Sequence, residues 1–229
     1  MSLPAAYYED DAVTIYHGDC REILPALQGD PFLLTDPPYG VSERTDRASK
    51  GRTNLARAND FAPVQGDDEP FDPAHLLGFS RAVLFGANYY AEKLPPSASW
   101  LVWDKLDGLA TERRVVGFDD NADVELAWTN LGGPARMVSH RWKGMVKGSE
   151  RGDSRVHPTQ KPVALMAQII AWRTTPGDTV LDAYMGSGST LRAAKDLGRR
   201  AIGIELDERY CEIAARRMAQ EVLDLGSAA

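Results

Sequence analysis

Short apolar runs alternate with helix-like patterns along most of the chain, and this alternation constrains the fold more than any other feature. The strand-like runs are residues 12–17, 32–35, 81–85, 100–103, 124–128, 179–181 and 201–204. The helical patterns are residues 20–27, 88–94, 162–172, 189–197 and 208–225. Strands that alternate with helices predict an α/β fold with a mostly parallel sheet covered on both faces.

Two regions depart from this alternation. The stretch Leu131-Gly132-Gly133-Pro134 predicts a hairpin that joins residues 124–128 to residues 135–142, and therefore an antiparallel strand. Residues 41–70 are polar and charged, and so long a loop in a compact domain is usually functional or disordered. We interpret it as a mobile flap, with disorder as the alternative. A chain of 229 residues suits one domain, so we expect a single domain over residues 1–229.

Composition narrows the class of protein. The two cysteines give no disulfide framework, and the four histidines are scattered, so we predict no metal site. The apolar run from Val163 to Trp172 is far shorter than the roughly 20 residues that cross a bilayer. We therefore expect a soluble protein of the reducing cytoplasm, with no membrane partner. The formal net charge of −7 argues mildly against a protein that coats nucleic acid.

A glycine turn between a strand and a helix predicts a ligand site. Residues 179–181 form the strand, Gly186 and Gly188 the tight turn, and Ser189 begins the helix, whose amino terminus favours a ligand. The loop lacks the lysine of a P-loop, and a leucine replaces the third glycine of a dinucleotide fingerprint. Asp182 suits a ligand ammonium, and Glu205 ends the next strand where it can accept from ribose hydroxyls. This combination predicts S-adenosylmethionine.

The tetrapeptide Asp36-Pro37-Pro38-Tyr39 directly follows a predicted strand, at the edge of a sheet where ligands bind. Neither proline donates an N–H, so their carbonyls can act as acceptors beside the Asp36 carboxylate. Tyr39 adds a planar ring. The set suits a flat heterocycle that carries an amino group, whereas the tetrapeptide alone would favour a simple proline-rich turn.

Further motifs make the resemblance specific. With His17-Gly18-Asp19-Cys20, residues 157–162 (His-Pro-Thr-Gln-Lys-Pro) and Ile202-Gly203-Ile204-Glu205, the chain resembles the amino-methylating DNA methyltransferases of the β arrangement, in which the catalytic motif precedes the cofactor motif. The resemblance implies a Rossmann-like S-adenosylmethionine-dependent methyltransferase fold with a circularly permuted motif order. The expected sheet has seven mostly parallel strands and one of them antiparallel.

The resemblance also assigns the cofactor-binding residues. They are Asp19 at the adenine, Thr159 and Lys161 at the methionine end, Asp182, Gly186, Gly188 and Ser189 in the loop, and Glu205 at the ribose. Tyr184 stands where the family usually has phenylalanine, and it can face the sulfonium through a cation–π contact. Structural alternatives stay open: Asp19 and Thr159 as helix caps, and Lys161 as a solvated side chain.

A basic segment is the candidate DNA surface. It contains Arg136, Arg141, Trp142, Lys143, Lys147, Arg151 and Arg155. The alternative is a solvated loop that is basic by chance. Residues 104–157, which include this segment, are a candidate DNA-recognition insertion. They and the flap are too short for a separate recognition domain, so we expect modest sequence specificity, a short site, or help from a second subunit or a homodimer.

The expected reaction is transfer of a methyl group from S-adenosylmethionine to the 6-amino group of adenine in DNA, after the base is flipped from the duplex. Aspartate at the first position of the tetrapeptide resembles adenine enzymes more than cytosine 4-amino enzymes, which are the runner-up. The motif order argues against RNA and protein-glutamine methyltransferases. A non-catalytic DNA-binding or regulatory subunit is a further alternative, disfavoured by the intact tetrapeptide.

Overall fold

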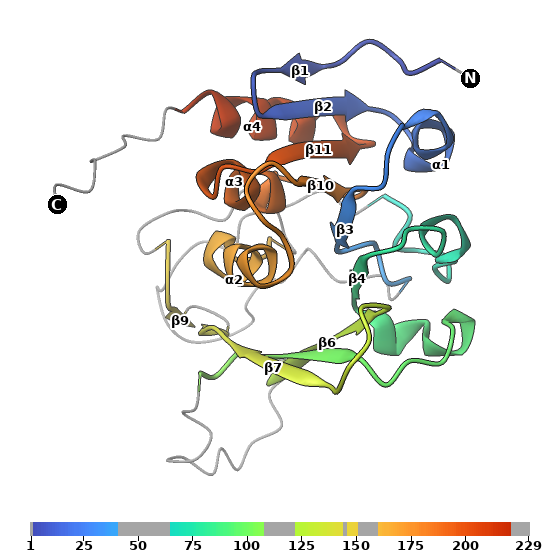
Figure 1. Cartoon of the computed structure of the whole chain (residues 1–229), viewed down its shortest axis with the longest axis vertical. Coiled ribbons are helices and arrows are strands. Elements are labelled where there is room, and N and C mark those ends of the chain that lie inside the picture. Colours follow the sequence, from blue (N-terminus) through green and yellow to red (C-terminus); the bar gives the residue numbers. More distant parts are fainter. Residues whose placement is uncertain (1, 41–64, 108–121, 144–145, 151–159, 221–229) are drawn as a thin grey trace, which may run out of the picture. The chain divides into compact units, whose positions relative to one another are not determined.

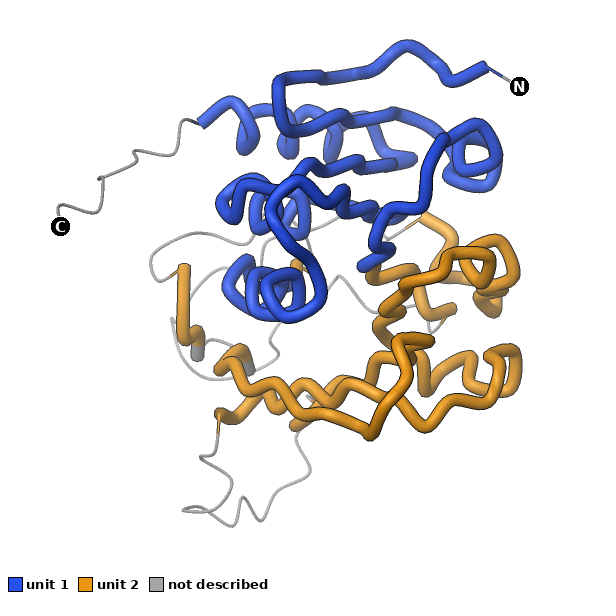
Figure 2. The backbone as a smooth tube through the Cα atoms, in the orientation of Figure 1, with its two compact units in different colours: residues 1–34, 161–229 blue, residues 35–160 orange. Residues whose placement is uncertain are grey.

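The computed structural model describes residues 2–40, 65–107, 122–143, 146–150 and 160–220 (Figure 1). The chain forms two compact units (Figure 2). Unit 1 comprises residues 1–34 and 161–229, and unit 2 comprises residues 35–160. In the described ranges, no helix has both the length and the apolar character needed to cross a membrane.

Unit 1 carries the parallel part of the fold. Its strands lie in the order β1 (Tyr8–Glu9), β2 (Val13–His17), β11 (Arg200–Glu205), β10 (Thr179–Asp182) and β3 (Phe32–Thr35). The last four are mutually parallel, and β1 is antiparallel to β2. All four side chains of β3 are buried, as expected for a strand covered on both faces.

The helices of unit 1 are α1 (Cys20–Ile23), the short 3-10 helix η1 (Leu24–Ala26), α2 (Val163–Arg173), α3 (Ser189–Asp196) and α4 (Glu208–Ala219). Helix α3 packs on β10 and β11, and α4 packs on β2 and β11 (Figure 1). Helix α4 was expected to reach residue 225, but it ends at Ala219 because Gln220 adopts an extended conformation.

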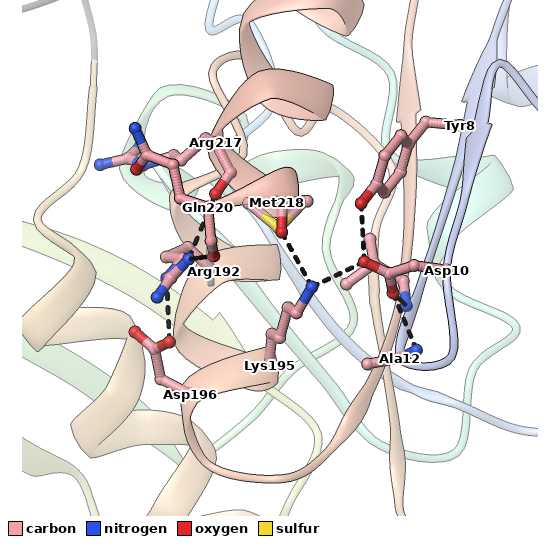
Figure 3. Close-up of polar contacts among 10 residues, drawn as sticks. Tyr8, Asp10, Ala12, Arg192, Lys195, Asp196, Arg217, Met218 and Gln220 are labelled. Atoms are coloured by element: carbon pink, nitrogen blue, oxygen red, sulfur yellow. Dashed lines mark hydrogen bonds and ion pairs between the residues drawn. The ribbon is translucent and has the colours of Figure 1, made fainter. Parts of the chain in front are cut away.

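Basic side chains of α3 hold the end of α4 and the turn before β2 (Figure 3). The Lys195 ammonium donates to the Met218 carbonyl at 2.8 Å and to the Asp10 carboxylate at 2.6 Å. Arg192 donates to the Gln220 carbonyl at 2.9 Å. The last carbonyls of a helix have no partner within it, so these cations satisfy groups that would otherwise need water.

Unit 2 contains the strand order β4 (Ala82–Phe85), β6 (Val124–Thr129), β5 (Trp100–Asp104) and β7 (Arg136–Ser139). Strand β6 is antiparallel to both β4 and β5, which confirms the predicted antiparallel strand. The predicted hairpin is wrong, because β7 pairs with β5 in parallel register. The reason is that β4 and β5 occupy the two hydrogen-bonding edges of β6, so β7 finds a partner only at the outer edge of β5.

The remaining elements of unit 2 are short. They are the 3-10 helices η2 (Ala74–Leu76), η3 (Ala87–Tyr89) and η4 (Ala91–Lys93), and a separate hairpin of β8 (Trp142–Lys143) and β9 (Val146–Lys147). The helix expected over residues 88–94 is replaced by η3 and η4, because Tyr90 between them leaves the helical region at φ −134°. All seven predicted strands are present in the two units, but the predicted count of seven is too low, because β1 in unit 1 and β7 in unit 2 raise the number of described strands to nine, besides the hairpin of β8 and β9. Strand β1 is a second antiparallel strand that was not predicted from the sequence.

Candidate active site

The predicted glycine turn connects β10 to α3 in unit 1. Gly186 and Gly188 have φ values of 50° and 78°, in the left-handed region that favours glycine. The turn also lies directly on the backbone of β11. A Cβ atom added to Gly203 would stand 2.4 Å from the Met185 sulfur and 2.6 Å from Leu191 Cδ2. The strand–turn–helix arrangement expected for a cofactor loop is therefore present.

Glu205 binds this loop as well as ending β11. One carboxylate oxygen accepts from the Gly186 N–H and the other from the Asp207 N–H, both at 2.9 Å. Burial raises the pKa of the Glu205 carboxyl, while the N–H groups act in the opposite direction. Each carboxylate oxygen has two lone pairs, so capacity remains for ribose hydroxyls. The predicted ribose acceptor thus also holds the loop in shape.

Asp182 and Tyr184 flank the start of the loop. The Asp182 side chain is buried and accepts from the Tyr184 N–H at 3.2 Å. The Tyr184 hydroxyl interacts with the Cys20 thiol, which places the loop next to the segment that begins at Asp19. Burial, followed by the effect of Cys20, raises the pKa of Tyr184, so its hydroxyl remains protonated. Residues far apart in the sequence meet here within unit 1.

Asp19 is the N-cap of α1, which confirms the structural alternative for this residue. Its carboxylate accepts from the Arg21 N–H at 2.9 Å and forms an ion pair with the Arg21 guanidinium at 2.6 Å. Contact with a cofactor adenine is compatible with capping and stays a prediction.

Two further predicted cofactor residues have structural partners. The Ser189 hydroxyl accepts from Arg217 of α4 at 3.2 Å, so this side chain attaches the loop to α4. Lys161 is only 7% exposed, and the solvated alternative for it is wrong. The N-cap of α2 is Pro162, which makes no side-chain capping bond. Thr159 lies outside the described residues.

The tetrapeptide begins directly after β3 and belongs to unit 2. The Tyr39 hydroxyl donates to the Asp36 carboxylate. The Tyr39 ring stacks on Tyr89, with ring centroids 5.1 Å apart and planes at 14°. Burial raises the pKa of Tyr39 well above its usual range, and the Asp36 and Glu125 charges act in the same direction. The tetrapeptide therefore brings a carboxylate acceptor and an aromatic ring into direct contact. Within it, Pro37 is buried and Pro38 is half-buried.

Gly86 and Asp67 also contact the tetrapeptide, and neither of them was identified from the sequence. Gly86 has a φ of 67°, and an added Cβ would stand only 1.8 Å from Tyr39 Cε1, so the ring lies against the glycine. The Asp67 carboxylate accepts from the N–H groups of Tyr39 and Gly40, at 3.0 and 2.9 Å. The sequence did offer a signal for Gly86 and Tyr89. Gly86 comes directly after an apolar strand, and two consecutive tyrosines begin three residues later. No local signal distinguishes Asp67 from the acidic residues beside it.

The basic segment is described only in part. Arg136 is exposed on β7, and Arg141 is half-buried. The Trp142 ring is 4% exposed and the Lys147 ammonium lies 4.9 Å from its centroid, so the tryptophan supports this lysine and offers no free ring face. The Lys143 side chain, Arg151 and Arg155 lie outside the described residues, as does most of the candidate flap.

Comparison with known proteins establishes the family. The model of the N6_N4_Mtase family, described as DNA methylase, matches residues 91–216. YubD, a protein of Escherichia coli (strain K12) that carries the name methylase, is 32% identical over 236 residues, which cover 92% of this chain and 93% of that protein. The chain belongs to the N6/N4 DNA methylase family. The predicted methyltransferase identity and S-adenosylmethionine as cofactor are thereby confirmed at the level of this family.

Other relatives of this DNA methylase agree with that assignment. The type II methyltransferase M2.DpnII of Streptococcus pneumoniae is 42% identical over 86 residues, which are 38% of this chain and 32% of that protein. The M1.HpyAVI complex with S-adenosylmethionine matches with a TM-score of 0.53 and 24% identity, covering 91% of this chain and 100% of the other. The cytosine-N4-specific PvuII DNA methyltransferase matches with a TM-score of 0.60 and 16% identity, over 95% and 90%. These structural likenesses confirm the predicted fold.

Proposed function

We propose that this DNA methylase transfers a methyl group to the 6-amino group of adenine in DNA. The observation that carries the proposal is the setting in unit 2, where the Asp36 carboxylate is held next to the Tyr39 ring. A flipped purine needs a flat surface to replace its lost stacking and an acceptor for its amino hydrogens. Tyr39 supplies the surface together with exposed Tyr89, which stacks on it, and Asp36 supplies the acceptor.

The polar side chains and the glycine turn of unit 1 fit the cofactor. Buried Asp182 suits the ammonium of its amino acid part, and Glu205 suits the ribose hydroxyls. Gly186 and Gly188 allow close approach of the backbone at the start of α3. When bound, S-adenosylmethionine supplies an electrophilic methyl group on sulfur. Asp19, Tyr184, Ser189, Lys161 and Thr159 complete the proposed set.

Asp36 acts on the nucleophile. Its carboxylate accepts one amino hydrogen of the base and a carbonyl of Pro37 or Pro38 accepts the other, which localises the nitrogen lone pair for attack on the methyl carbon. Nitrogen would gain the methyl group and lose one proton, which Asp36 would accept, while the electron pair of the broken carbon–sulfur bond would remain on the sulfur of the cofactor. The protein's contribution is mainly alignment, which is worth several kcal/mol when the reacting atoms are held correctly.

The DNA surface of the proposal is the basic segment. Exposed Arg136 and the Lys147 ammonium provide positive charge within the described part of unit 2, and phosphate contacts of this kind position a duplex without reading its sequence. Arg141, Lys143, Arg151 and Arg155 extend the segment in sequence. We propose residues 104–157 as the recognition region, with modest specificity or with help from a second copy or subunit.

The experiment is transfer of a labelled methyl group to unmethylated DNA, RNA and protein, followed by digestion of the DNA and identification of the modified nucleoside. Wild type should produce N6-methyladenine. Asp36→Ala should be slower by at least about 100-fold, the usual loss when a proton-accepting group is removed. If the product were N4-methylcytosine, the target base would be cytosine and the adenine proposal would be wrong. Transfer only to RNA or protein would contradict the DNA substrate, and no transfer to any of them would favour a non-catalytic subunit.

A further inference from the structure

We infer that Asp67 is a positioning residue for methyl transfer, holding the backbone of the catalytic tetrapeptide through two hydrogen bonds. This inference rests on the proposed function of Asp36 and Tyr39. Asp67 does not touch the reacting atoms. It acts through Tyr39, 28 residues away in the sequence.

The contact has the geometry of an anion site made by backbone. One oxygen of the Asp67 carboxylate accepts from two consecutive N–H groups, those of Tyr39 at 3.0 Å and Gly40 at 2.9 Å. Gly40 has a φ of 74°, and successive N–H groups at such a left-handed turn converge on one acceptor. The Asp67 side chain is 6% exposed, so water competes weakly for these bonds.

The turn around Asp67 fits closely on the tetrapeptide. A Cβ added to Gly40 would stand 2.4 Å from the Glu69 carbonyl oxygen, so the two backbones approach as closely as glycine permits. A Cβ on Gly66 would lie 3.8 Å from the Pro38 ring. Asp67 is thus the polar centre of a contact that holds the chain directly after the tetrapeptide.

The direction of the Tyr39 ring depends on this backbone. The ring lies against Gly86, stacks on Tyr89 and donates its hydroxyl to Asp36. A rotation of the Tyr39–Gly40 peptide would move the ring and the Asp36 carboxylate that it binds. Misplacement of a reacting group by about 1 Å can lower a rate by 100-fold. Loss of Asp67 should therefore lower kcat more than it alters cofactor binding.

Four forms of the full chain test the inference by steady-state methyl transfer to DNA. Asp67→Ala removes the acceptor, Asp67→Glu retains the charge but displaces it by one methylene, and Asp67→Asn keeps an oxygen at the same place. Asp68→Ala is the matched control, because it removes the same charge from the exposed neighbouring residue. Hydrogen exchange at the Tyr39 and Gly40 amides reports the contact without reference to activity.

We expect kcat to fall at least about tenfold for Asp67→Ala and Asp67→Glu, with KM for S-adenosylmethionine changed by less than about twofold. Asp67→Asn should recover most of the rate, and Asp68→Ala should match wild type. Amide protection should be lost in the two slow variants and kept in the other two. Wild-type kcat in both slow variants, or an equal loss in Asp68→Ala, would overturn the inference alone. An inactive wild type would overturn the proposed function together with it.

Discussion

Replacing Gly86 by alanine tests how the Tyr39 ring is held. Gly86 has a φ of 67° and a ψ of 15°, and an added Cβ would stand 1.8 Å from Tyr39 Cε1, 2.3 Å from Cδ1 and 2.4 Å from Cζ. Three neighbouring ring atoms at these distances place the Cβ above the face of the ring, where no rotation of the tyrosine about its own axis relieves the clash. The ring must move, and with it the bond to Asp36.

Two terms determine the size of the effect. Alanine in the left-handed region costs about 1 kcal/mol, partly offset by about 0.5 kcal/mol from its smaller freedom in the unfolded chain. Forcing a methyl group into a packed contact costs about 1–3 kcal/mol. The free energy of unfolding should therefore fall by about 1.5–3.5 kcal/mol, which corresponds to about 3–14 °C in Tm for a chain of this size. The rate of methyl transfer should fall as well.

Gly132 provides the matched control. Its φ is 71°, but an added Cβ there has nothing within 4 Å, so Gly132→Ala carries only the backbone term. Urea unfolding followed by circular dichroism should show a cost of about 1 kcal/mol or less for this control. In a Tyr39→Ala background, Gly86→Ala should cost no more than the control, because the clash has been removed. Equal costs for the two glycine variants in the native background would refute the packing argument.

Three further predictions concern stability, cofactor and DNA. Asp10 is partly buried, but its bonds from Lys195, Tyr8 and the backbone lower its pKa to about 2. Its stabilisation is therefore present above its unfolded pKa of about 4 and is lost as pH falls through about 2. Asp10→Asn should cost up to about 2 kcal/mol in urea unfolding at pH 7, and this cost should shrink as pH falls from about 4 and disappear below about 2, whereas a difference independent of pH would contradict this. Gly203→Ala should weaken S-adenosylmethionine binding by about tenfold in calorimetry, because a methyl group there overlaps the side chains of Met185 in the loop and Leu191 in α3 and would displace the loop; unchanged affinity would contradict the fit. Arg136→Ala should reduce the slope of log affinity for DNA against log salt by about 1 in fluorescence anisotropy, and Arg216→Ala on α4 should serve as the basic control; equal effects would remove Arg136 from the interface.

The strands were predictable because their signal is local. Residues 32–35 and 179–182 are compact apolar runs that end at a polar residue, and both form buried parallel strands. The pairing of β7 was not predictable from its turn, since it depends on which edges of β6 are already occupied by β4 and β5. The local hydrophobic pattern therefore predicts where a strand lies in the sequence, whereas its pairing partner depends on the arrangement of the whole sheet.

The same distinction applies to the candidate site. Glu205 was predictable as an acceptor next to the glycine turn because it ends the strand that follows that turn in the sequence, although its binding of ribose stays a prediction. Asp67 stands beside Asp68 and Glu69, and nothing in composition separates the buried acid from its exposed neighbours. The function proposed for it depends on a contact across 28 residues, which brings its carboxylate to the Tyr39 N–H. A residue of this kind is defined by a contact between distant parts of the chain, and local sequence patterns do not reveal such a contact.

Both units use a carboxylate to hold the backbone next to a left-handed glycine. In unit 1, Glu205 accepts from the N–H of Gly186, where φ is 50°. In unit 2, Asp67 accepts from the N–H groups of Tyr39 and Gly40, where φ is 74°. Glycine allows the left-handed conformation of each turn, but it loses more conformational entropy on folding than other residues do. The hydrogen bonds to the carboxylate stabilise the folded turn and offset part of this loss. The acids near these turns are therefore expected to differ in function: Asp36 acts on the base, whereas Asp67 and part of the acceptor capacity of Glu205 act on the protein itself.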